Sequence, residues 1–155
     1  MPSYKSNVKA VISRIKWDLE QGVKRAIENS LREATIDVTS SNLHRIHNEG
    51  KAVDGSNIGN YVEGPYKKKR SKKGKRIDTV NLSYSGKLSK EYAALKISSN
   101  LYAIGFLTSY GSELAGYIEE NYGQKIWGKT PGDEAIVRAI FDRNLKKELK
   151  GLTIK

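Results

Sequence analysis

Apolar side chains recur at spacings of three and four along the first part of the chain, the pattern of a helix with one buried face. The positions that share this spacing are Val8, Val11, Ile12, Ile15, Leu19, Val23, Ala26, Ile27, Leu31 and Ala34. They predict an amphipathic helix over residues 4–33, about 40 Å long at the rise of an α-helix. A small domain does not need that length. We therefore expect the apolar side chains near the start, Val8, Val11, Ile12 and Ile15, to contact a neighbouring subunit.

A second helix is predicted over residues 37–48, where Val38, Leu43 and Ile46 would point inward before Gly50 ends the helical pattern. Gly22 lies inside the first helix, where a glycine costs about 1 kcal/mol relative to alanine. We therefore expect a close packing contact at Gly22 that a side chain would block.

The middle of the chain changes from helical to alternating periodicity. Residues 77–84 place Val80, Leu82 and Tyr84 on one face and predict a strand. Residues 92–98 and 101–108 predict two more strands, and the short turn between them favours an antiparallel hairpin. Together they predict an antiparallel sheet of three to four strands within residues 77–108.

Two helices are predicted after the sheet, over residues 112–122 and 131–150. Thr130 is suited to cap the last helix and Pro131 to occupy its first position, while Gly151 ends it. The order of elements predicts an α+β fold. A length of 155 residues fits a single domain over residues 1–155.

The net charge of +11 comes mostly from one segment, so that only three of these charges lie elsewhere. The segment is predicted to be an exposed basic loop over residues 67–76. Its eight basic residues are Lys67, Lys68, Lys69, Arg70, Lys72, Lys73, Lys75 and Arg76. Three interpretations stay open. The loop contacts DNA phosphates while Tyr61 and Tyr66 stack on bases, it is a solvated loop, or it orders against an acidic protein partner.

The sequence predicts no catalytic, cofactor or metal site. Cysteine is absent, and the two histidines, His44 and His47, are three residues apart with no third ligand at a recognisable spacing. The glycines at 55 and 59 lack the lysine of nucleotide-binding loops. No apolar run approaches the roughly 18–20 residues of a membrane span. We expect a protein of the cytoplasm that is not an enzyme and has no membrane or small-molecule partner.

Several short motifs occur in a fixed order between residues 40 and 150. Residues 54–61 read DGSNIGNY, and a lysine-rich stretch follows that ends in KG at 73–74. Residues 80–88 read VNLSYSGKL, and residues 122–130 read YGQKIWGKT before the terminal helix. This order resembles the virion-morphogenesis proteins of tailed bacteriophages, the tail-completion and head–tail joining (neck) group, in versions associated with phages of Bacteroidetes.

The resemblance implies a structural role in the virion, assembled in the host cytoplasm. The protein would be a subunit of a homo-oligomeric ring in the neck, acting as a tail terminator or as a head–tail joining protein. Its partners would be copies of itself and other neck, portal-side or tail proteins. The sequence departs from the family pattern in two places. A motif after the hairpin is present only in its first residues, at 102–106, and a Pro-Ala-Arg-Pro-Phe run common in the family is missing, which leaves the neck position open. The rival interpretation is a nucleic-acid-binding protein that uses residues 67–76.

Overall fold

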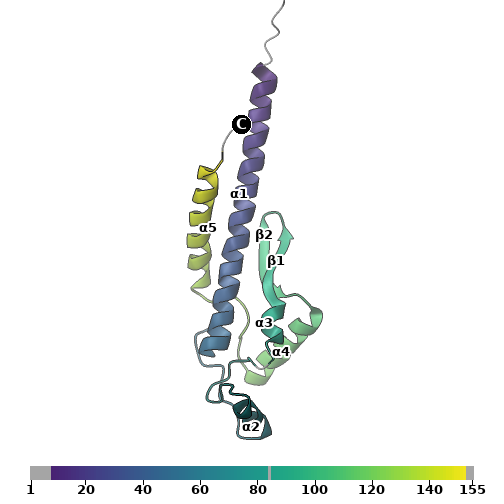
Figure 1. The fold of residues 1–155 in the computed structure, drawn as a ribbon, viewed down its shortest axis with the longest axis vertical. Coiled ribbons are helices and arrows are strands. Elements are labelled where there is room, and N and C mark those ends of the chain that lie inside the picture. The colour runs from purple at the N-terminus through teal and green to yellow at the C-terminus, as the bar shows by residue number, and fades with distance from the viewer. Residues whose placement is uncertain (1–7, 84, 153–155) are drawn as a thin grey trace, which may run out of the picture.

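The computed structural model describes residues 8–83 and 85–152 and is built along one long helix (Figure 1). Helix α1 spans Val8–His44 and continues directly into one π-helical turn, η1, at Arg45–Glu49. Helix α5 (Asp133–Lys150) packs along one side of α1, and a β-hairpin lies along its other side. The expected α+β class is confirmed.

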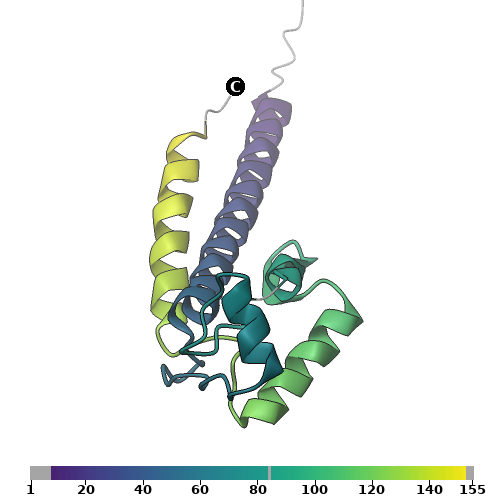
Figure 2. The ribbon, with the colours of Figure 1, turned by 60° about the horizontal axis from the view of Figure 1, so that its bottom comes forward.

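Three short helices lie at the C-terminal end of α1, away from its start (Figures 1 and 2). They are α2 (Pro65–Lys72), α3 (Lys87–Glu91) and α4 (Ser109–Tyr122). The main hydrophobic core lies in this part of the molecule. Its buried members are Ile46, Ala52, Ile58, Tyr61, Val80, Leu88, Tyr92, Ala115, Ile126 and Trp127. No helix among the described residues has the length and apolar character needed to cross a membrane.

Two separate helices are predicted over residues 4–33 and 37–48. The break between them is wrong. Residues 8–44 form one α-helix, and residues 4–7 lie outside the described part. The region of the predicted break is rich in serine, threonine and β-branched residues, which favour helices weakly. Their hydroxyls are accommodated within the helix. Thr35 donates to the carbonyl of Leu31 and Thr39 to that of Thr35, four residues back in each case.

Helix α5 runs antiparallel to α1 against a row of buried, mostly small residues. This row recurs every four residues as Gly22, Ala26, Ser30, Ala34, Val38 and Asn42. At one end the Asn42 side chain donates to Asp133 at the start of α5, and at the other Leu152 lies against Gly22. A Cβ atom at Gly22 would lie 2.7 Å from a methyl carbon of Leu152, which confirms the expected close contact there.

Replacing Ala34 with leucine should lower the free energy of unfolding by about 1–3 kcal/mol. Ala34 is fully buried under α5, and extra methyl groups in a packed interface force side chains or backbone to shift. Urea denaturation followed by circular dichroism measures the change. The matched variant Ala135→Leu on the exposed side of α5 should stay within about 0.5 kcal/mol of the wild type. Equal stability of the two variants would contradict close packing along this row.

The described sheet has only two strands, β1 (Tyr92–Ser98) and β2 (Leu101–Phe106), paired antiparallel as the predicted hairpin. A sheet of three to four strands is therefore not confirmed. Residues 77–83 make one isolated bridge, between Thr79 and Asn60, and Leu82 has a φ of +50°, which interrupts the extended backbone. Tyr84, the last residue of the predicted strand, lies outside the described residues.

The last two helices begin at different residues from those predicted. Helix α4 begins at Ser109 instead of 112, because the Thr108 hydroxyl accepts the backbone N–H of Gly111 and caps the helix. Helix α5 begins at Asp133, two residues after Pro131. The cap bond there runs in the opposite sense from the prediction: the Asp133 carboxylate accepts the backbone N–H of Thr130, at 2.7 Å.

Candidate functional site

The basic segment is largely helical, so the prediction of an exposed loop over residues 67–76 is wrong for its first six residues. Helix α2 begins at Pro65, a residue well suited to a first helical turn, and ends at Lys72. Arg70 projects from α2 into the protein and is fully buried. The remaining basic residues of the segment are exposed, apart from the half-buried Lys67, which pairs with Glu63.

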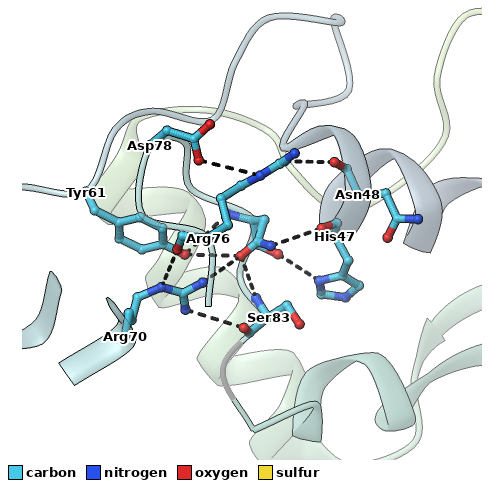
Figure 3. A network of polar contacts seen from close by, with 8 residues as sticks. His47, Asn48, Tyr61, Arg70, Arg76, Asp78 and Ser83 are labelled. Atoms are coloured by element: carbon cyan, nitrogen blue, oxygen red, sulfur yellow. Dashed lines mark hydrogen bonds and ion pairs between the residues drawn. The ribbon is translucent and has the colours of Figure 1, made fainter. Parts of the chain in front are cut away.

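The guanidinium of Arg70 binds three oxygen atoms within residues 76–83, the stretch that follows α2 (Figure 3). Its Nε donates to the carbonyl of Arg76 (2.9 Å), and its terminal nitrogens donate to Asn81 Oδ1 (3.0 Å) and to the carbonyl of Ser83 (3.4 Å). The guanidinium also lies 4.3 Å from the centre of the Tyr61 ring, within range of a cation–π interaction. Arginine suits this position because its donors form a planar fork.

Asn81 connects this arrangement to the end of the long helix. Its Nδ2 donates to the carbonyl of His47 at 3.1 Å, and its own carbonyl lies 2.8 Å from His47 Nδ1. The Tyr61 hydroxyl lies 3.3 Å from both Asn81 Oδ1 and Asn81 N. Arg76 adds a second link, donating to the carbonyl of Asn48 at 2.8 Å while it pairs with Asp78. Residues 70–83 are thus fastened to η1 by hydrogen bonds.

Of the two tyrosines near the basic segment, Tyr61 and Tyr66, only one is accessible to a ligand. Tyr61 is only 8% exposed and lies beneath Arg70, so the expectation that it stacks on a base is wrong. Tyr66 is 52% exposed, and its ring lies 5.9 Å from that of Tyr61. The exposed lysines of the segment therefore form a charged surface on a rigid support, with one accessible tyrosine beside them.

The second surface is the free end of α1. Leu152 packs against Gly22, and residues 8–21 extend beyond the covered part of the helix (Figure 1). Val11 is 53% and Ile12 48% exposed, and Ile15 is half-buried. Val8 begins α1, and its side chain lies outside the described part. Trp17 and Leu19 add two exposed apolar side chains that we had not assigned to this surface.

The two histidines point to different partners. His44 is largely exposed and lies 3.3 Å from the Glu49 carboxylate. Burial lowers the pKa of His47, although the hydrogen bond to Asn81 acts in the opposite direction. His47 Nδ1 lies against a carbonyl oxygen and so carries the proton of a neutral ring, while Nε2 is buried without a hydrogen-bond partner among the described residues. No group of His, Asp or Glu that could hold a metal ion occurs in the described ranges.

Glu119 on α4 holds the loop that carries the core residues Ile126 and Trp127. Its Oε1 accepts both of their backbone N–H groups at 2.8 Å, and its Oε2 binds Lys125 at 2.7 Å. Burial alone would raise the pKa of the Glu119 carboxyl, but the hydrogen bonds from Lys125, Trp127 and Ile126 outweigh it, and the net pKa is lowered. The sequence alone gave no sign of this role, since Glu119 stands beside the exposed Glu120.

Stability at acidic pH should therefore depend on Glu119. Because its pKa is lower in the folded protein, its contribution is complete above the ordinary value of 4.5 and is lost as the pH falls through the folded-state pKa. Glu119→Gln should lower the free energy of unfolding by about 1–3 kcal/mol at pH 7, with a smaller difference from the wild type at acidic pH. Urea titrations at several pH values measure this. A deficit that stays constant with pH would contradict the assignment, and Glu120→Gln provides the exposed control.

Comparison with known proteins supplies no relative: the chain matches no protein-family model, no curated protein and no solved structure.

Proposed function

We propose that this protein is a structural subunit of a tailed-phage virion, a ring-forming tail-completion or head–tail joining protein of the neck. The observation that carries the proposal is the free end of α1. About four turns of helix present Val11, Ile12 and Leu19 outside the folded body. Apolar surface exposed to water costs about 25 cal/mol per Å², which favours burial against another molecule.

The other surfaces support a binding role over a reaction. Near the basic segment, the buried side chains of Tyr61, Arg70 and Asn81 bind one another through hydrogen bonds, as in a structural network. The side chains that project outward from this segment are basic, and the exposed Tyr66 lies beside them. Tyrosine is enriched where two proteins meet, because its ring is apolar and its hydroxyl tolerates water. The order of motifs along the sequence adds the neck as the place of assembly.

Light scattering and negative-stain microscopy of the purified protein test the proposal. Rings, or assembly on addition of a portal-side or tail protein encoded nearby, are the expected result. Capsid, portal and tail genes on either side of the gene would agree with it. A protein that stays monomeric with every such partner and shifts duplex DNA at low salt would instead support nucleic-acid binding through residues 67–76, since phosphate contacts weaken steeply with salt.

A further inference from the structure

The outer face of α4 combines tyrosine with negative charge. Helix α4 holds three glutamates and no lysine or arginine. Glu119 faces the core loop, whereas Tyr110, Glu113, Tyr117 and Glu120 follow one another at helical spacing along the exposed face. Tyr117 is 67% exposed, the highest exposure among the described tyrosines. This acidic tyrosine face, as we call these four residues, has the composition of a docking surface for a basic partner.

Gly116 adds an independent observation on the same face. It lies in the interior of α4, where glycine destabilises a helix relative to alanine. A Cβ atom at Gly116 would meet nothing within 4 Å, so packing inside the chain does not require a glycine there. A missing side chain on an exposed helix face lets the backbone of another molecule approach closely.

A lysine already occupies one end of this face. Lys87 Nζ lies 4.2 Å above the ring centre of Tyr110, in the geometry of a cation–π interaction. Tyr117 stands two helical turns further on, beside Glu113 and Glu120. A second lysine that enters from outside would find at Tyr117 both an aromatic ring and a carboxylate.

The chain itself carries a matching basic helix face. Arg70 points from α2 into the core, so Lys68 and Lys72, which are on the opposite side of the helix and one turn apart, point outward. Lys75 follows in the exposed turn after α2. Because α2 and α4 both turn these faces away from their own protein body, the two faces can meet only between molecules.

We propose that the outer face of α2 in one copy, carrying Lys68 and Lys72, docks on the acidic tyrosine face of α4 in the next copy. The contact joins two different surfaces, so it is head-to-tail, and repetition with a closing rotation produces a ring. This inference rests on the proposed function and identifies the partner of the basic segment as a second copy of this chain. The hydrogen bonds of Arg70 hold α2 rigid for this contact.

Reversing the charges on the α2 face or on the acidic tyrosine face of α4 tests the contact. Lys68→Glu with Lys72→Glu should abolish self-association, and so should Glu113→Lys with Glu120→Lys, each raising the dissociation constant at least about 100-fold. An equimolar mixture of the two variants should regain association, because every contact then joins opposite charges. Sedimentation velocity at 50 mM and 500 mM salt, with circular dichroism to verify folding, measures these results.

Control variants change the net charge equally at other exposed sites. Lys146→Glu with Lys147→Glu, and Glu33→Lys with Asp142→Lys, should associate like the wild type. Loss of association in these controls, or failure of the mixture to associate, would overturn the proposal. So would a wild type that stays monomeric while it binds DNA through α2. If association is insensitive to the charge exchange but is lost on mutation of the free end of α1, this contact is refuted and the proposed function stands.

Discussion

Replacing Arg70 with alanine is expected to lower the free energy of unfolding by about 2–4 kcal/mol. The change removes the donor that binds the part-buried carbonyls of Arg76 and Ser83 and the buried side-chain oxygen of Asn81, and an acceptor left buried without a partner costs about 1–3 kcal/mol. Asn81 Oδ1 retains the Tyr61 hydroxyl, so the loss is less than three full penalties. Urea denaturation followed by circular dichroism measures the difference.

The conservative variant Arg70→Lys separates hydrogen-bond geometry from charge. A lysine keeps the positive charge but cannot present three donors in a plane, so we expect it to recover less than half of the loss. Lys72→Ala on the outer side of the same helix should change stability by less than about 0.5 kcal/mol. Trypsin should cleave residues 67–76 faster in Arg70→Ala than in the wild type. Stability of Arg70→Ala equal to that of Lys72→Ala would show that the buried network contributes nothing.

The double variant Val11→Glu with Ile15→Glu is expected to fold normally and fail to assemble. Both side chains lie on the free end of α1, so two carboxylates there remain hydrated in the monomer. In an assembled interface the same carboxylates would be buried without partners, which costs several kcal/mol. Sedimentation velocity should show loss of the assembled species, and circular dichroism should show an unchanged helix content.

Ala10→Glu with Ser13→Glu is the matched control, because it adds the same charge to the other side of the same helix end. We expect this control to assemble like the wild type. If Val11→Glu with Ile15→Glu unfolds as a monomer, this stretch belongs to the core and the interface lies elsewhere. If it assembles normally, the free end of α1 has no role in assembly.

Periodicity predicted those elements whose side chains are sorted by burial. The stripe from Val23 to Ala34, the hairpin over residues 92–106 and the helix around Ile140 all follow a helical or alternating pattern, and each is present. The predicted break near residue 35 does not occur: residues there favour helices weakly, but tertiary packing of Ala34 and Val38 under α5 overrides that weak preference. The extra strand was predicted from alternation alone, but Leu82 takes a left-handed conformation.

The candidate site was the harder part to predict, because its key contacts are long-range and polar. Nothing in a run of eight basic residues distinguishes Arg70 from its neighbours, yet it alone is fully buried. Its partner Asn81 is eleven residues away and had been placed in a strand. Such a pair leaves no periodic signal, since a single buried arginine requires acceptors at the right positions in space and not at a fixed spacing. The exposed end of α1 was predictable because it depends only on length.

The pairing of α1 with α5 joins the two ends of the sequence, and this has a consequence during synthesis. Helix α1 leaves the ribosome before α5, which lies some 90 residues later and follows after about 5–20 s at ordinary rates of translation. For that interval the row from Gly22 to Asn42 has no cover of its own. A neighbouring nascent or newly released chain carries an identical α5 that fits the same row. Exchange of the terminal helix between copies is therefore the misassembly to which this topology is most exposed, and polysomes that bring the copies close together would favour it.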